Sequence, residues 1–80
     1  MRLPRDLSGV ELARALRGLG YAVTRQSGSH VRLTTQQDGE HHVTVPAHDP
    51  LKLGTLRGIL DGVARHHGIT VDGLAQRLFG

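Results

Sequence analysis

Two alternating segments around one turn constrain the fold of this 80-residue chain most strongly. Residues 30–34 (HVRLT) and 41–45 (HHVTV) alternate polar and apolar side chains, which is the pattern of a half-buried β-strand. Residues 36–39 (QQDG) lie between them and carry an Asp-Gly turn signal. The pattern predicts an antiparallel hairpin that turns one apolar face towards a core and leaves the other face polar.

The residues before the hairpin predict a helix and one more strand. Ser8 and Glu11 spell the S-x-x-E capping box, in which each side chain accepts a hydrogen bond from the other residue's backbone N–H. We therefore expect a helix over residues 8–19, which Gly20 can end in a left-handed conformation. The β-prone residues 21–26 follow at once and predict a short strand.

The residues after the hairpin predict two further helices. Thr55 can cap a second helix, with Gly68 just past its end, and Thr70 can cap a short last helix over residues 71–78. The order is then helix, three strands, helix and short helix. Strands joined by hairpins and separated from helices indicate an α+β fold, with a three-stranded antiparallel sheet and the helices on one face.

The charge of the chain favours a negatively charged partner. The formal net charge is +3, and nine of the ten basic residues are arginine, whose planar guanidinium binds phosphate through two donors at once. A small, arginine-rich basic domain is typical of proteins that bind nucleic acid. Tyr21 and Phe79 are the only aromatic residues, so few side chains can stack on unpaired bases.

The rest of the composition limits the class of protein. There is no cysteine, which excludes disulfides and thiolate metal sites. No apolar run approaches the roughly 20 residues that span a bilayer, and residues 1–12 lack the apolar stretch of a signal peptide. We therefore expect a cytoplasmic protein without membrane contact, and a single domain over residues 1–80.

The alternation assigns His30 to the face of the sheet that the helices leave uncovered. Val31 and Leu33 must turn towards the helices, because they are the apolar positions of their strand. His30 and Arg32 then share the opposite face, two residues apart. This face is open to water or to a ligand.

The hairpin also predicts what lies beside His30. Antiparallel pairing brings the start of its strand next to residues 45–48, at the end of the other strand. His48 and Lys52 belong to the loop that follows, and we expect this loop to pack near the turn of residues 27–29. Two histidines, one arginine and one lysine would then converge at one edge of the open face.

Such a group of side chains could bind and cleave RNA. A histidine can act as base or acid near neutral pH. RNA supplies its own nucleophile, the 2′-hydroxyl, so neither a metal nor a cofactor is required. Gly28 and Ser29 lack bulk and could offer backbone donors to a phosphate close to His30.

The same residues are compatible with less specific roles. A histidine on the wet face of a strand is often simply solvated, and Gly28-Ser29 can be a plain turn. A small basic module that binds RNA without cleaving it is therefore an alternative, and a domain whose open face docks a protein is another. His30 and His48 are the only plausible pair of metal ligands and lack a clear third ligand beyond Asp49, so no metal site is predicted.

Two further features have structural interpretations. Gly58 and Gly62 lie within the second predicted helix, and close approach of that helix to the sheet or to the first helix would explain them. His66 and His67 end the same helix, where histidines can complement the free carbonyl groups.

Several motifs, taken in their order, resemble the HicA toxins, the YcfA-like family. The resemblance extends over roughly residues 7–79. It rests on LGY (19–21), RQSGSHVRL (25–33), VTVPAH (43–48), KLGTLRGIL (52–60) and the tail ITVDGLAQRLF (69–79).

The resemblance implies both a fold and a function. The implied fold is that of a double-stranded-RNA-binding domain, and the implied function is a ribonuclease toxin of a type II toxin–antitoxin pair. Such a toxin, an mRNA interferase, cleaves messenger RNA and is neutralised by a HicB-type antitoxin that covers its active site. The resemblance also implies that His30 is the catalytic residue and gives His48 a supporting role. Lys52, Thr55 and Arg57 would contact RNA or the antitoxin.

Overall fold

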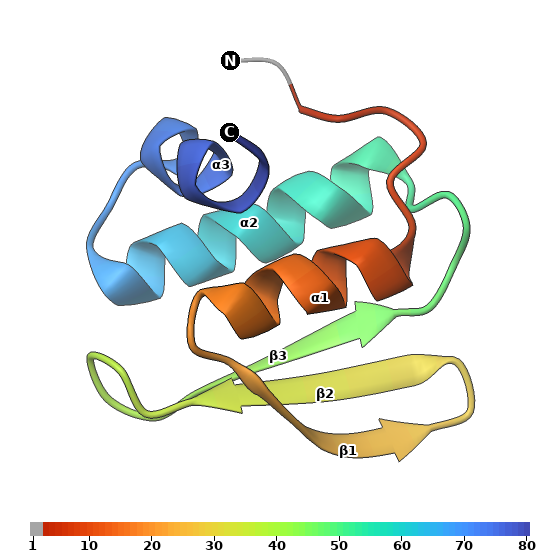
Figure 1. The fold of residues 1–80 in the computed structure, drawn as a ribbon, viewed down its shortest axis with the longest axis horizontal. Coiled ribbons are helices and arrows are strands. Elements are labelled where there is room, and N and C mark those ends of the chain that lie inside the picture. The colour runs from red at the N-terminus through yellow and green to blue at the C-terminus, as the bar shows by residue number, and fades with distance from the viewer. Residues whose placement is uncertain (1–2) are drawn as a thin grey trace.

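The computed structural model of the protein describes residues 3–80, and within this range helices and strands follow one another in the predicted order (Figure 1). The elements are α1 (Gly9–Gly18), β1 (Ala22–Ser27), β2 (His30–Thr35), β3 (His41–Pro46), α2 (Leu53–His67) and α3 (Val71–Phe79). This confirms the α+β class and the helix–strand–strand–strand–helix order of a double-stranded-RNA-binding domain, followed by one more helix. None of the described helices is both long and apolar enough to cross a membrane.

The three strands form one antiparallel sheet in the order β1-β2-β3. Val31 pairs with Val45 and Leu33 with Val43, and all four side chains are buried. The predicted hairpin and its register are thus confirmed. Figure 1 shows all three helices on one side of the sheet, so the opposite side is uncovered.

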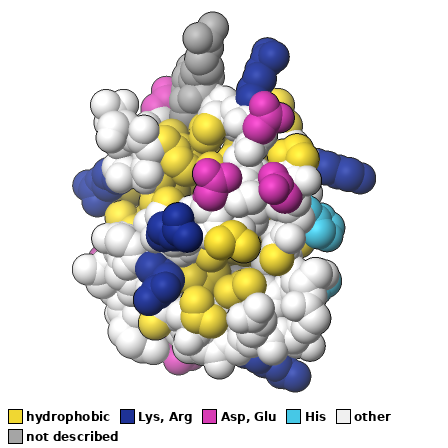
Figure 2. Space-filling view, turned by 45° about the vertical axis from the view of Figure 1, so that its right-hand side comes forward, with side chains coloured by type: hydrophobic (Ala, Val, Ile, Leu, Met, Phe, Trp, Pro, Cys, Tyr) yellow, Lys and Arg dark blue, Asp and Glu magenta, His cyan; other side chains and the backbone are white. Residues whose placement is uncertain are grey.

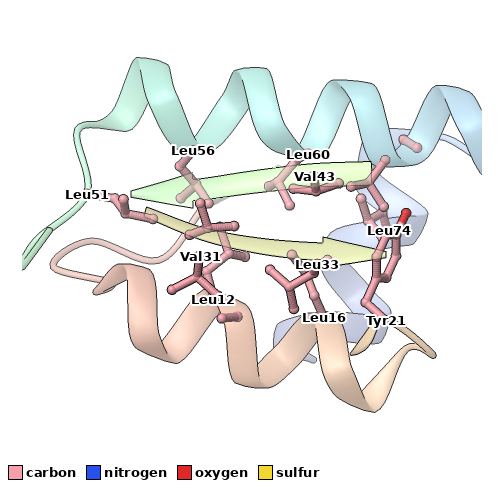
Figure 3. Packing of buried hydrophobic residues seen from close by; sticks show 14 residues of the cluster. Leu12, Leu16, Tyr21, Val31, Leu33, Val43, Leu51, Leu56, Leu60 and Leu74 are labelled. Atoms are coloured by element: carbon pink, nitrogen blue, oxygen red, sulfur yellow. The ribbon is translucent and has the colours of Figure 1, made fainter. Parts of the chain in front are cut away.

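A single cluster of apolar side chains fills the space between the sheet and the helices. In Figure 3 leucines of α1 and α2 point towards the apolar positions of the strands: Leu12, Leu16, Leu56 and Leu60 meet Val31, Leu33 and Val43. Each of these four leucines is at most 2% exposed. Burying one leucine side chain contributes about 1.5–3 kcal/mol, so this packing holds β2 and β3 against the helices.

The helix starts follow the predictions at α1 and α3 but not at α2. The capping box is present: the Ser8 hydroxyl accepts from the Glu11 N–H at 3.0 Å, and the Glu11 carboxylate accepts from the Ser8 N–H at 3.0 Å. These hydrogen bonds lower the pKa of Glu11. Thr70 likewise caps α3, through a hydrogen bond from the Gly73 N–H at 3.0 Å.

The prediction that Thr55 caps the second helix was wrong, because α2 already begins at Leu53 and Thr55 lies in its first turn. Lys52 is the N-cap, and its side chain makes no capping hydrogen bond. Tertiary contacts fix this start instead. Leu51 is buried, and its N–H donates to the Leu7 carbonyl at 2.8 Å, so the chain is anchored immediately before the helix.

The interpretation of Gly58 and Gly62 as points of close approach was also wrong. A Cβ atom built on either residue would have no neighbour within 4 Å, so both positions face open space. The close approach is at Gly9 instead, the first residue of α1. A Cβ there would collide with the Pro46 carbonyl group, and the Gly9 N–H donates to the His48 carbonyl at 2.9 Å.

Candidate functional site

His30 is the first residue of β2, and its side chain is exposed on the uncovered face of the sheet. The burial of β2 alternates, with His30 and Arg32 exposed and Val31 and Leu33 buried, as the sequence predicts. His30 lies opposite Pro46 of β3 and Ser27 of β1. It is therefore at the end of the central strand, where the β1–β2 turn meets the exit of β3.

The loop after β3 packs against the turn before His30, as expected. The Ala47 N–H donates to the Ser29 carbonyl, which joins the two segments directly. Gly28 adopts a left-handed conformation with φ of 57°, which glycine accepts without strain. His48, the residue after Ala47, is exposed. Its side chain therefore borders the same edge of the sheet as the turn.

Lys52 lies further along that loop, as the exposed N-cap of α2. Among residues 3–80 the side chains of His30, Arg32, His48 and Lys52 make no hydrogen bond or ion pair with other protein groups. The four side chains border the same edge of the sheet but are not hydrogen-bonded to one another. Their polar groups are therefore free to contact a ligand.

The second histidine of the open face is held by protein groups, in contrast to His30. His42 Nδ1 lies 2.8 Å from the Thr34 hydroxyl, which lies 2.9 Å from the Thr24 hydroxyl. His42 Nε2 lies 3.5 Å from Glu40. This row of polar side chains crosses all three strands, so of the two imidazoles on the face only that of His30 is left without a partner among the described residues.

The other three histidines of the fold belong to a separate cluster at the opposite end of the sheet. His66 and His67 lie in the last turn of α2, as expected, but their hydrogen bonds go to the β2–β3 turn. His66 Nε2 lies 3.0 Å from both the Gln37 and Gly39 carbonyl oxygens, and its ring stacks on His41 at 4.4 Å. Because carbonyl oxygens only accept hydrogen bonds, this nitrogen carries a proton.

Tyr21 connects the rest of this cluster. Its hydroxyl lies 2.9 Å from His41 Nδ1 and 3.0 Å from His67 Nε2, and His67 Nδ1 lies 2.9 Å from the Asp38 carboxylate. One assignment satisfies every contact with neutral rings: His41 donates to Tyr21, Tyr21 donates to His67, and His67 donates to Asp38. Sequence reasoning missed this cluster, since its hydrogen-bonded partners are 20 to 46 residues apart in the chain. Its role is to join α2 to the hairpin.

The histidine cluster predicts that stability falls in mild acid. Burial lowers the pKa of His41 from 6.5, and the neighbouring His66 and His67 lower it further. Below about pH 6.5 the unfolded chain therefore binds a proton more readily than the folded one, and the free energy of unfolding decreases as the pH falls through this range. Urea unfolding between about pH 8 and pH 5 measures this. A His41→Gln variant should show a flatter dependence, and a wild-type stability constant over this range would contradict the prediction.

At alkaline pH the stability depends on Tyr21, whose pKa is shifted in the opposite direction to that of His41. Burial raises the pKa of Tyr21 from 10.0 to about 12. The folded protein thus keeps the phenol proton that the unfolded chain loses, and stability should also fall as the pH rises through this interval.

The candidate site is a surface rather than a pocket. A well-formed hollow lies elsewhere, between the N-terminal segment, α2 and α3, and is lined by Leu3, Leu53 and Phe79 among others. Figure 2 shows Lys and Arg side chains mixed with acidic ones on one side of the molecule, so no block of a single charge covers it. Within residues 3–80 no group of three or more His, Cys, Asp or Glu side chains is placed to hold a metal ion.

The fold and the site together define a small α+β domain with an open, basic sheet face that carries one unpartnered histidine. The family model described as "HicA toxin of bacterial toxin-antitoxin" matches residues 9–69, which include every element from α1 to α2. The chain therefore belongs to the HicA toxin family, which confirms the resemblance seen in the sequence. It is thereby a toxin of a toxin–antitoxin pair and has a cognate antitoxin as its partner. No curated protein and no solved structure matched the chain.

Proposed function

We propose that this toxin is a metal-independent endoribonuclease that cleaves messenger RNA in the cytoplasm. The observation that carries the proposal is the exposed, unpartnered imidazole of His30 beside Arg32 on the uncovered face of the sheet. The antitoxin would be of the HicB type and would neutralise the toxin by covering this face.

His30 would act as a general base. The proton of the 2′-hydroxyl passes to the imidazole, the 2′-oxygen bonds to phosphorus, and the bond from phosphorus to the 5′-oxygen breaks. The leaving 5′-oxygen takes a proton from His48 in its protonated form or from water. The products are a 2′,3′-cyclic phosphate and a 5′-hydroxyl. Because the RNA supplies the nucleophile, the reaction uses neither a metal nor a cofactor.

The groups around His30 would hold the phosphodiester. Arg32 lies two residues along the same strand face and can offer two guanidinium donors to phosphate oxygens. Gly28 and Ser29 form the tight turn next to His30 and leave space for the RNA backbone. Lys52, at the start of α2, adds a positive charge at the same edge of the sheet.

A non-catalytic RNA-binding module is the second candidate. It is favoured by the fact that, among the described residues, no side chain is hydrogen-bonded to His30, whereas many catalytic bases are oriented by a third group. The same fold can serve either function, since activity depends on the site and not on the architecture. The module would bind RNA in a salt-dependent manner and leave it intact.

Incubation of the antitoxin-free protein with end-labelled RNA in EDTA separates the two functions. We expect cleavage to persist in the chelator and to give fragments that end in a 2′,3′-cyclic phosphate. The matched control is DNA of the same base sequence, which lacks the 2′-hydroxyl and should stay intact. Cleavage that stops on chelation would contradict metal independence, and a mobility shift without any fragments would support the binding module.

A further inference from the structure

Arg25 of β1 is the direct cross-strand neighbour of Arg32. Paired residues on antiparallel strands point to the same face of a sheet, so both arginines stand on the open face. The next pair on the same face is Ser27 with His30, beyond the pair of Gln26 with Val31. Arg25 and Arg32 are therefore two residue pairs away from the proposed catalytic histidine, and both side chains are exposed.

A β-bulge gives Arg25 this position. The register shifts between Val23 and Arg25, so that Thr24 is the extra residue of β1. In a regular strand Val23 opposite Leu33 would place Thr24 opposite Arg32 and would turn Arg25 towards the helix side. The bulge instead moves Arg25 onto the open face. Bulges often re-aim a side chain beside an active site in this way.

The two arginines have no acidic partner in the described part of the chain. The ion pairs there involve His42, Arg65 and His67, and none includes Arg25 or Arg32. Like charges directly opposite each other on neighbouring strands destabilise a sheet. A bound anion would remove this repulsion. Guanidinium groups bind phosphate with paired donors, which makes a phosphate the matching ligand.

We propose that Arg25 and Arg32 together form a clamp that binds the phosphate of the phosphodiester cleaved by His30. The inference rests on the proposed function and adds Arg25 to it as a substrate-binding residue. Neither aromatic residue of the chain belongs to this part of the sheet, so the clamp holds the RNA through its backbone and not through stacked bases.

The test compares Arg25→Ala with Arg17→Ala, which removes the same charge from an exposed position on α1. Both changes are made in a His30→Ala background, so that a labelled RNA oligonucleotide remains intact while its binding is measured at several salt concentrations. We expect Arg25→Ala to weaken binding about tenfold, as for the loss of one charge-assisted contact, and to reduce the salt slope by about one. Arg17→Ala should weaken it less than about twofold.

The conservative variant and the fold are checked in parallel. Arg25→Lys keeps the charge but loses the paired donors, and it should recover only part of the affinity. Urea unfolding of Arg25→Ala should show undiminished stability, because the substitution removes a like-charge contact. An affinity equal to that of Arg17→Ala, or a full recovery with lysine, would overturn the clamp.

The outcomes also separate the clamp from the proposed function. If the wild type cleaves RNA in EDTA but Arg25→Ala behaves like Arg17→Ala, the nuclease stands and the clamp fails. If the wild type never cleaves RNA but Arg25→Ala alone loses binding, the clamp stands and catalysis fails. A wild-type protein that does not bind RNA at all overturns both.

Discussion

His30→Ala is expected to reduce RNA cleavage by a factor of about 10² to 10⁴ and to leave the fold intact. A positioned general base contributes a rate factor of this size, and no other unpartnered imidazole shares the open face within the described residues. The His30 side chain is exposed and makes no hydrogen bond with the described residues, so its removal should not change stability. The measurement is the initial rate of cleavage of a labelled RNA by the purified variant, with urea unfolding as the check on the fold.

His42→Ala is the matched control, because His42 lies on the same face but is held by Thr34. It should cleave RNA at nearly the wild-type rate. In cells without antitoxin the His30 variant should permit growth and the His42 variant should arrest it. A His30 variant that cleaves RNA as fast as the wild type would rule out the assigned role.

Gly9→Ala is expected to lower the free energy of unfolding by about 1–3 kcal/mol, which is the usual range for overpacking a buried site. Gly9 is buried, and the added Cβ would collide with the Pro46 carbonyl group and crowd Ala47. Backbone atoms cannot rotate out of the way, so either α1 or the end of β3 must shift. Small domains of this size typically have a net stability of only about 3–5 kcal/mol, so the loss would be a large part of the total.

Gly58→Ala provides the matched comparison. Its Cβ would enter open space in the middle of α2, so the substitution should raise stability by up to about 1 kcal/mol through helix propensity alone. Urea unfolding of both variants measures the difference. Gly9→Ala should also slow RNA cleavage, because the displaced segment lies opposite His30. If the two alanine variants have the same stability, the close approach at Gly9 is not a constraint on the fold.

The open face could be predicted from the sequence in part. The alternation of residues 30–34 placed His30 and Arg32 on one face and Val31 on the other, and the register confirms this arrangement. Arg25 could not be found in the same way. Simple alternation from Val23 assigns it to the helix side, and only the pairing of β1 with β2 shows that a bulge reverses this assignment.

The starts of the helices also differ in whether the sequence predicts them. Ser8 with Glu11 and Thr70 with Gly73 are local caps three residues apart, and the sequence predicts both. The start of α2 is fixed by Leu51, which bonds to Leu7 more than 40 positions earlier in the chain. The prediction from Thr55 as a capping residue therefore placed the start of α2 too late, because tertiary contacts and not a local cap fix it.

Alternation, caps and turns specify the elements, their order and the direction of each hairpin side chain, because each of these signals spans only a few neighbouring residues. The tertiary structure alone decided the neighbours of Arg25, the close approach at Gly9 and the contact of His67 with Tyr21. Each of these joins segments that meet only once the sheet has paired and the helices have packed on it. Their partners depend on register and packing, which no short stretch of residues specifies.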